Sequence, residues 1–539
     1  MSITSLHQQH EAHQLFNTLD KRKCNLVEAS EIKRTFSSSG FSLRSPMLQD
    51  MRERLSQASP EINYDQFLVV VGDSLHLLKR IVWNNCAVKN WSGLTQGIGN
   101  CRAEALEADS GCGSLPSYIP ILTSASQPES LGVAFCSVSG QEFSQGVEQT
   151  PVTLQSCVLP ILYAVALEES GETAVHTKLG REPSGMKFND LHLNPDGLPF
   201  NPYTNAGGIQ LASMIYQSAE PYKRFMYCIS FLRSACGHGN VGFSNASYLS
   251  EKENCWRNLS ICYHMKESGC FASSVSADRA IEFYLQANSI EMSVQSLAVV
   301  AATLANAGIC PLTNERVMAS STVRSVLSLM ASCGMGSYSG EWAFEVGLPA
   351  KSGISGLTMV VVPGMGGWCA FGPLVDKHGN SIRCLHFYKS LGKFLQSISI
   401  TPHYDWDLYD GEDPSLDTAS LITPQALEVR RRTLGAAWLY AACTCDLVTM
   451  QQCVADGVDV DFVDYDQRSA MHLAVRFQHI AVVRYLLALF AQDYIPDRWG
   501  RTPVDYALTL TDAVLKQSIL AMLPSAANGE LYTPPPLTS

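Results

Sequence analysis

The chain has 539 residues, of which 46% are apolar, and its 38 basic and 50 acidic residues leave a formal net charge of −12. A chain of this length usually contains about three to four domains. An acidic protein without a dense basic patch is a poor candidate for a nucleic-acid binder. No apolar run reaches the roughly 20 residues that cross a bilayer, so we expect no membrane span.

The 18 cysteines are scattered and include no Cys-x-x-Cys pair, which argues against the common zinc sites. We expect no metal and no cofactor. Residues 1–19 lack the apolar core of a secretion signal, so the thiols are expected to be reduced and the protein intracellular. The same segment is not rich in arginine, as a mitochondrial transit peptide would be. These features predict the cytosol.

The first part of the chain is predicted to be helical. Apolar residues recur at three- and four-residue intervals in four stretches, 10–19, 28–36, 46–55 and 64–83. This is the spacing of helices that bury one face. The sequence therefore predicts a helical domain over residues 1–83.

The segment between the first two of these helices has the length of an EF-hand loop. Asp20 and Glu31 occupy positions one and twelve, where such a loop places calcium ligands. Positions three and five hold Arg22 and Cys24, and Asn25 stands at the turn glycine. Calcium would lose two oxygen ligands here and meet a guanidinium group. We therefore predict an EF-hand-like helix pair that binds no calcium.

The middle of the chain has a mixed α/β pattern. Residues 84–113 are weakly patterned and are interpreted as a linker, and the α/β core is expected over 114–400. Residues 132–138 and 359–362 resemble strands. The clearest helix lies within 284–304, whose apolar stripe is formed by Val294, Leu297, Val300, Ala301 and Leu304.

A second linker and a repeat follow the core. The polar, acidic segment 401–425 is interpreted as the linker. Residues 464–474 recur as residues 497–507 with a period of 33 residues. This is the ankyrin period, and the Thr-Pro and His-Leu-x-Ala pairs match ankyrin helix starts. We predict ankyrin repeats over 426–525, which could dock a protein partner, and a disordered tail over 526–539.

Serine and lysine three residues apart share one helix face, so the amine can accept the hydroxyl proton. Three pairs in the chain have this spacing: Ser30 and Lys33, Ser184 and Lys187, Ser390 and Lys393. The first lies in the helical domain, and the second follows a proline and contains a glycine. Because the spacing alone is common, we interpret these serines as capping or solvated groups.

Three other segments carry a family resemblance. They are Gln155-Ser156-Cys157-Val158-Leu159, Asn201-Pro202-Tyr203-Thr204-Asn205-Ala206-Gly207-Gly208 and Lys351-Ser352-Gly353-Ile354-Ser355-Gly356. Together they resemble the serine-dependent glutaminases of animals over about residues 118–387. The resemblance implies a multidomain protein with an EF-hand-like helical cap, a β-lactamase-like or penicillin-binding-protein-like α/β core and C-terminal ankyrin repeats. It also implies dimers or tetramers and a mitochondrial location.

The resemblance further implies a site for L-glutamine and L-glutamate. Ser156 is the expected nucleophile, and its N–H and that of Ile354 are the expected oxyanion donors. The expected substrate-binding residues are Tyr118, Ser156, Asn205, Glu251, Asn258, Tyr284 and Ile354. A carboxylate such as that of Glu251 can pair with the ammonium group of a free amino acid, while amides and hydroxyls bind its oxygens.

Structural interpretations of these residues remain open on the sequence alone. Glu251 stands next to Lys252 and Glu253 and could belong to a solvated charge cluster. Asn205, which precedes Ala206-Gly207-Gly208, could form a turn. The tyrosines at 118 and 284 could be core aromatics.

Two positions depart from the family pattern. Leu159 replaces the lysine base, and Gly336 replaces a tyrosine that serves proton transfer. General acid–base assistance is worth about 10²–10⁴ in rate, so we expect weak glutamine hydrolysis through a Ser156 acyl-enzyme. Lys351 or Tyr338 could substitute for the lost groups. The alternatives are an inactive protein that binds glutamine or glutamate or co-assembles with an active relative, and a scaffold led by the repeats.

Overall fold

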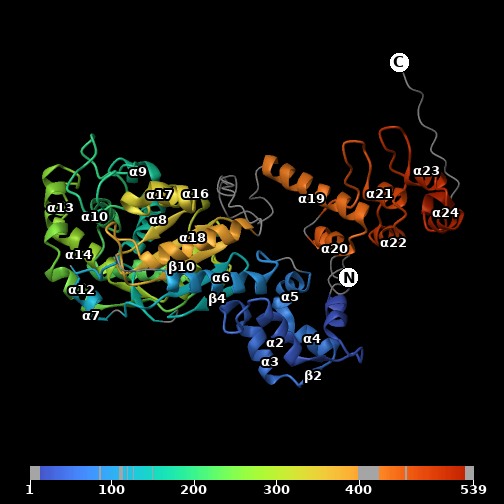
Figure 1. Cartoon of the computed structure of the whole chain (residues 1–539), viewed down its shortest axis with the longest axis horizontal. Coiled ribbons are helices and arrows are strands. Elements are labelled where there is room, and N and C mark those ends of the chain that lie inside the picture. Colours follow the sequence, from blue (N-terminus) through green and yellow to red (C-terminus); the bar gives the residue numbers. More distant parts are fainter. Residues whose placement is uncertain are drawn as a thin grey trace, which may run out of the picture. The chain divides into compact units, whose positions relative to one another are not determined.

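The computed structural model describes residues 12–83, 86–108, 113–117, 119–125, 127–147, 150–397, 424–455 and 458–527. The chain divides into two compact units (Figure 1). Unit 1 comprises Met1–Ile81 and Cys86–Leu416, and unit 2 comprises Val82–Asn85 and Asp417–Ser539. Unit 1 therefore contains both the N-terminal helices and the α/β core.

The N-terminal part of unit 1 is helical, as its periodicity predicts. A helix over 12–19 is followed by α2 (Ala29–Ser38), η1 (Pro46–Leu48), α3 (Gln49–Gln57), α4 (Tyr64–Val71), η2 (Gly72–Ser74) and α5 (Leu75–Val82). Gly72 has a φ of 47°, a backbone conformation that favours glycine, and it divides the last predicted helix in two.

The loop that joins the first two helices turns around the Asp20 carboxylate. The Asp20 carboxylate accepts the N–H of Cys24 at 3.2 Å and that of Asn25 at 2.7 Å. Asn25, which stands where the turn glycine is expected, has a φ of 59°. The short strands β1 (Val27–Glu28) and β2 (Glu61–Ile62) then pair antiparallel. The turn is thus closed by protein hydrogen bonds.

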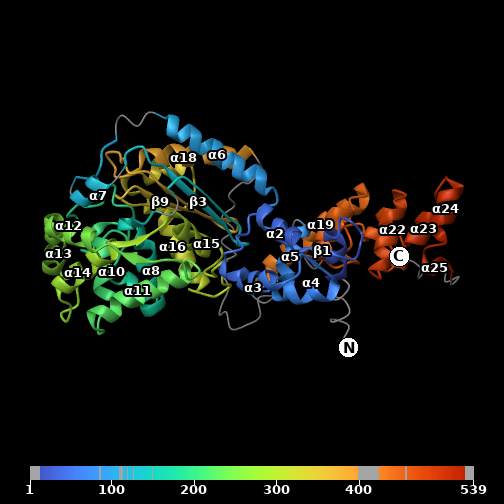
Figure 2. The same ribbon diagram turned by 90° about the horizontal axis from the view of Figure 1, so that it is seen from below.

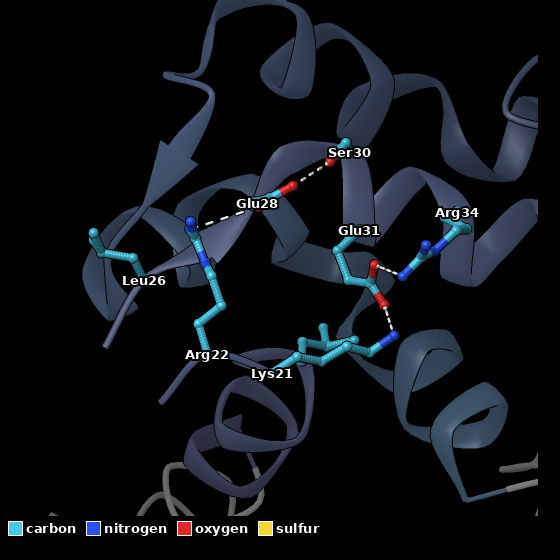
Figure 3. Close-up of a pocket in the computed structure, with 8 residues that line it drawn as sticks. Lys21, Arg22, Leu26, Glu28, Ser30, Glu31 and Arg34 are labelled. Atoms are coloured by element: carbon cyan, nitrogen blue, oxygen red, sulfur yellow. Dashed lines mark hydrogen bonds and ion pairs between the residues drawn. The ribbon is translucent and has the colours of Figure 1, made fainter. Parts of the chain in front are cut away.

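Basic side chains form ion pairs with the acidic side chains in and beside this loop (Figure 3). The Lys21 ammonium lies 2.5 Å from Glu31, which Arg34 also contacts. Hydrogen bonding from Lys21 holds the pKa of the Glu31 carboxyl below its usual range. Arg22 lies 2.6 Å from Glu61. The carboxylate that would bind calcium at position twelve is therefore already paired with protein cations.

A five-stranded antiparallel sheet forms the centre of unit 1, with strand order β4-β3-β10-β9-β8. Its strands are β3 (Gly132–Ser137), β4 (Glu142–Gln145), β8 (Ala350–Ser352), β9 (Leu357–Val362) and β10 (Gly366–Phe371). Helices α6 (Trp91–Glu107) and α18 (Ile382–Ser397) cover one face, and α15 (Val294–Ala305) covers the other (Figure 2). The apolar stripe expected within 284–304 is confirmed as α15.

Both faces of this sheet are buried under helices, and successive residues of a strand point to opposite faces. Met359 and Val361 belong to the core on the α15 side, whereas Val360 and Val362 belong to the core on the α18 side. Gly367 lets α15 approach, since a Cβ there would lie 2.1 Å from the backbone nitrogen of Ala302. The strand-like residues 132–138 and 359–362 are confirmed as β3 and β9.

The linker expected over 84–113 is wrong for most of its length. Helix α6 occupies 17 residues of it and buries Leu94, Ile98, Cys101 and Ala105 against α18. These apolar positions follow helical spacing, but polar and glycine residues between them weaken the pattern. Of the second expected linker, 401–425, residues up to 423 lie outside the described part of the chain.

A helical region flanks the α15 side of the large sheet. It contains the small sheet β5-β7-β6, formed by β5 (Val152–Thr153), β7 (Ile290–Met292) and β6 (Gly242–Phe243). The longer helices are α8 (Leu159–Ser170), α10 (Asn205–Met214), α11 (Pro221–Ala235), α12 (Asn245–Glu253), α13 (Trp256–Glu267), α14 (Ala277–Asn288) and α16 (Ser320–Cys333). The shorter elements are α7 (Pro120–Ala125), η3 (Gln155–Val158), α9 (Glu172–His176), η4 (Gly336–Tyr338) and α17 (Ser339–Glu345). Residues 159–167 of α8 are all buried, so this helix is central to the region.

Unit 2 is helical. Its elements are α19 (Pro424–Thr444), α20 (Leu447–Ala455), α21 (Ala470–Arg476), α22 (Ile480–Ala488), α23 (Pro503–Leu508), α24 (Ala513–Leu520) and α25 (Pro524–Ala527). The two sequence copies have the same turn geometry. The Asp464 carboxylate accepts the N–H of Asp466 and Arg468, and the Asp497 carboxylate accepts the N–H of Trp499 and Arg501. The 33-residue repeat is thus also a structural repeat.

Candidate active site

Ser156 lies at a sharp turn that leads into α8. It is the second residue of η3, and Gln155 before it has a φ of 47°, which is strained for a residue with a side chain. Ser156 is partly exposed, while Gln155 and Cys157 on either side are buried. No hydrogen bond joins Ser156 Oγ to a described residue. The turn therefore presents a hydroxyl at the N-terminus of a buried helix.

Leu159 fills the position one turn after Ser156. It is fully buried and belongs to the core on the α15 side. Its Cδ2 atom would lie 2.8 Å from a Cβ at Gly208 in α10. An apolar side chain packed in this way can neither accept nor donate a proton.

The turn after β8 lies against the Ser156 segment. A Cβ at Gly353 would lie 2.8 Å from the carbonyl oxygen of Leu154 and 3.4 Å from the N of Cys157. The Cys157 thiol also donates to the carbonyl of Lys351 at 3.3 Å. Ile354 follows this glycine, and its N–H bonds to no described residue. Two backbone segments far apart in sequence thus meet beside the serine.

Glu251 of α12 is a buried carboxylate, with 2% of its surface exposed. Its Oε2 accepts a hydrogen bond from Gln155 Nε2 at 3.0 Å, and its Oε1 accepts one from Asn288 Nδ2 at 3.0 Å. Burial raises the pKa of Glu251 to about 7, against the opposing effect of these two amides. No described cation contributes to this pKa. The alternative of a solvated charge cluster is therefore wrong for Glu251.

Asn205 and Asn258 form a second polar pair in the same region. Asn205 begins α10, and its Nδ2 donates to Asn258 Oδ1 of α13 at 2.7 Å. Both side chains are more than nine-tenths buried. Asn205 is thus a helix residue with a buried amide, whereas a turn would leave it on the surface.

Tyr284 of α14 faces the same centre. Burial raises its pKa well above the usual range, and the nearby Glu251 carboxylate raises it further. Its Cε2 atom would lie 2.6 Å from a Cβ at Gly208, the same glycine that contacts Leu159. A larger residue at 208 would displace one of these two side chains. Tyr118 lies outside the described residues.

Gly336 opens η4 and is exposed, with a φ of 62° and no atom within 4 Å of where its Cβ would stand. The nearby Tyr338 does not replace the missing hydroxyl. Its OH donates to Glu345 at 2.6 Å, and its ring packs against the core on the α18 side. Tyr338 would therefore have to leave these contacts, through a shift of the loop, to substitute at Gly336.

Two residues of this centre were not expected from the sequence. Gln155 was recognised only as part of the Ser156 segment, and Asn288 was not singled out. Asn288 follows Tyr284 by one helical turn, a spacing that places both on one face and could have identified it. The Ser-x-x-Lys pairs near the surface are structural: Ser30 donates to Glu28, and Ser184 accepts the N–H of Met186.

Other site types find no support among the residues that the structure describes. Within them, no group of three or more histidine, cysteine, aspartate or glutamate side chains is arranged to hold a metal ion. None of the described helices combines the length and apolar character of a membrane span.

Comparisons with known proteins agree on one family. The glutaminase family model matches residues 113–398. The glutaminase liver isoform, mitochondrial, of Rattus norvegicus is 36% identical over 478 residues, which cover 87% of this chain and 77% of that protein. Putative glutaminase 2 of Caenorhabditis elegans is 35% identical, over 84% of this chain and 74% of that protein.

Solved structures show the same relationship for the core. The probable glutaminase ybaS aligns with a TM-score of 0.54 and 30% identity, over 57% of this chain and 97% of that one. The glutamate form of Mglu aligns with a TM-score of 0.52 and 29% identity, over 60% of this chain and 70% of that one. The chain therefore belongs to the glutaminase family, and its helical and α/β core resembles the β-lactamase-like fold of these proteins.

Proposed function

We propose that this protein binds L-glutamine and hydrolyses its side-chain amide slowly, through an acyl-enzyme on Ser156. The observation that carries the proposal is the environment of Glu251. Its buried carboxylate has two amide donors, Gln155 and Asn288, and no described cation. Burying such a group is costly unless an opposite charge pairs with it. The ammonium group of a free amino acid would supply that charge.

The remaining groups fit the rest of the substrate. Asn205, Asn258 and Tyr284, together with Tyr118, would bind the carboxylate and the side-chain amide. Ser156 Oγ would attack the amide carbon, and the N–H groups of Ser156 and Ile354 would bind the oxyanion. Ammonia then leaves and water hydrolyses the ester to glutamate. The N–H of Ile354, which bonds to no described residue, and the contact of Gly353 with the serine turn support this arrangement.

The rate is expected to be low because two family groups are absent. Position 159 is apolar and buried, and position 336 has no side chain. In a comparable serine hydrolase, binding and the oxyanion hole alone retain about 10³–10⁴ over the reaction in water. The same two positions favour the second candidate, a glutamine- or glutamate-binding protein without turnover that could co-assemble with an active relative in a dimer or tetramer.

One set of measurements separates these functions. Ammonia release is followed for the parent chain and for Ser156→Ala, and binding of glutamine and glutamate is followed by calorimetry for the parent and for Glu251→Gln. Hydrolysis that disappears in Ser156→Ala supports the enzyme. Binding that disappears in Glu251→Gln without ammonia release supports the binding protein. If neither amino acid binds, the remaining function is that of a scaffold protein, in which the repeats bind a partner and the core has no ligand.

We further propose the accessory roles that the sequence indicates. The N-terminal helices form an EF-hand-like cap that binds no calcium. The repeats of unit 2 are ankyrin repeats that dock a protein partner. The protein acts inside the cell, either in mitochondria, as in the name of the rat relative, or in the cytosol.

A further inference from the structure

Lys351 is a buried amine on the side of the sheet that holds Ser156. Only 4% of its surface is exposed. In the β8–β9 ladder it stands opposite Met359, which belongs to the core on the α15 side together with Cys157 and Leu159. Residues opposite one another in an antiparallel pair share a face. The Lys351 side chain therefore points toward the elements that carry the serine.

Among the described residues, no carboxylate neutralises this amine. Its Nζ donates to the carbonyl of Ser352 at 2.5 Å, and no described acidic side chain contributes to its pKa. Burial lowers the pKa of Lys351 to about 8. The Cys157 thiol is not a counter-ion, because burial raises its own pKa to about 12. Roughly a fifth of Lys351 is thus neutral at about pH 7.4, and a neutral amine has a lone pair that can accept a proton.

The amine lies close to the nucleophile turn. Its hydrogen-bond acceptor, Ser352, directly precedes Gly353, whose Cβ would lie 3.4 Å from the N of Cys157. The Lys351 carbonyl in turn accepts from the Cys157 thiol. The side chain of Cys157, the residue after Ser156, is therefore in contact with the backbone of Lys351.

We propose that Lys351 is the general base of this protein, in place of the lysine absent at position 159. The inference rests on the proposed function, because it assigns the proton transfers of that same site. The neutral amine takes the proton of Ser156 Oγ–H as the Oγ–C bond forms. It returns that proton to the amide nitrogen as the C–N bond breaks and ammonia leaves. It then takes a proton from the attacking water and gives it back to Ser156 Oγ as the ester is cleaved.

Three variants distinguish a base from a positive charge that only stabilises the site. Lys351→Met removes both the charge and the base, whereas Lys351→Arg keeps the charge but cannot accept a proton. We expect both to release ammonia at least about 10²-fold more slowly than the parent. Adding Leu159→Lys to Lys351→Met should restore most of that loss, because a second amine then lies one turn from Ser156.

The pH profile supplies a readout that a structural role would not produce. The rate of the parent should rise about tenfold per pH unit and level off near pH 8, where the amine becomes neutral. Glutamate binding measured by calorimetry should remain in Lys351→Met, which confirms a folded pocket. That variant should also unfold at a higher temperature than the parent at pH 7, since it removes a buried charge that has no described counter-ion.

The outcomes separate this inference from the proposed function. Ammonia release that survives in Lys351→Arg, or a pH profile that does not change in either variant, overturns Lys351 as the base and leaves the hydrolysis by Ser156 standing. Ammonia release by the parent no greater than that of Ser156→Ala overturns both.

Discussion

Leu159 and Tyr284 meet at Gly208, where a Cβ would lie 2.8 Å from Leu159 Cδ2 and 2.6 Å from Tyr284 Cε2. Position 159, where the family resemblance implies a lysine base, thus lies beside the tyrosine expected to bind substrate. Tyr284 is also close enough to Glu251 for that carboxylate to raise its pKa. This contact places Leu159 beside the polar pocket. A substitution at 159 should therefore change the catalytic rate more than the stability of the rest of the protein.

Restoring both lost groups should raise activity. We expect Leu159→Lys with Gly336→Tyr to release ammonia at least about 10²-fold faster than the parent. Space is open around Gly336, but its φ of 62° will cost the tyrosine about 1–2 kcal/mol of strain. Leu159→Met with Gly336→Tyr is the matched control, because methionine is long but accepts no proton. Equal rates in parent, test and control would show that position 159 has no part in proton transfer.

Substrate binding should depend on pH through Glu251. Its pKa of about 7 means that half of the carboxyl is protonated at that pH and cannot pair fully with an ammonium group. The apparent affinity for glutamate should fall about tenfold between pH 7.5 and 6, measured by calorimetry. Glu251→Gln should bind about 10–100-fold more weakly and lose this dependence. The exposed Glu253→Gln is the control, and an unchanged pH profile in Glu251→Gln would assign the titration elsewhere.

Ionisation of the Glu251 carboxyl should strengthen substrate binding but lower the free energy of unfolding. Because burial raises its pKa in the folded state, its contribution to the free energy of unfolding is present below its ordinary value of 4.5 and is lost as the pH rises through about 7. Glu251→Gln should therefore gain stability relative to the parent between pH 5 and 8 in urea denaturation. A constant difference between the two proteins across this range would contradict a buried titrating group.

Calcium should not stabilise the parent chain. Lys21 and Arg34 already pair with Glu31, and Arg22 stands where an oxygen ligand is needed. Millimolar calcium should leave the Tm unchanged in thermal denaturation. A triple variant, Arg22→Asp with Cys24→Asp and Asn25→Gly, restores the missing ligands and the turn glycine, and its Tm should rise with calcium. A calcium-dependent Tm in the parent would reject the interpretation of the loop.

Unit 2 should depend on the cap of its last repeated helix. Thr502 accepts the N–H of Asp505 at 3.3 Å, and the Asp505 carboxylate accepts the N–H of Thr502 at 2.8 Å. Thr502→Ala should cost about 1 kcal/mol in the unfolding of this unit, measured with urea in the full chain. Thr509→Ala, on an exposed helix end, should have little effect. Equal losses in both variants would show that the cap is not what stabilises the repeat.

The sequence predicts those elements of the fold whose apolar residues recur at regular short intervals. The 33-residue period, the stripe of α15 and the N-terminal helices follow from the spacing of apolar residues within short segments. Helix α6 was missed because its stripe is interrupted by polar residues and glycines, so only the packing against α18 reveals it. The division of the predicted helix 64–83 depends on one glycine in an unusual backbone conformation.

The site shows the same distinction between local and tertiary information. Short motifs that resemble those of the glutaminases indicate Ser156, Asn205 and Glu251 and the replacements expected at 159 and 336. Whether Glu251 is buried, and which groups bind it, depends on Gln155, 96 residues away, and on Asn288, 37 residues away. The burial of Lys351 away from any described carboxylate and the bond of Tyr338 to Glu345 are likewise decided by packing.

The sequence by itself determined which chemical groups are present, including an apolar residue at 159 and a glycine at 336, since these are properties of single positions. Only the tertiary structure decided how those groups behave. Burial removes the water that would stabilise their charged forms, so it shifts the proton affinities of Glu251 and Lys351 toward neutral pH. That desolvation comes from segments distant in sequence, and no local pattern records it.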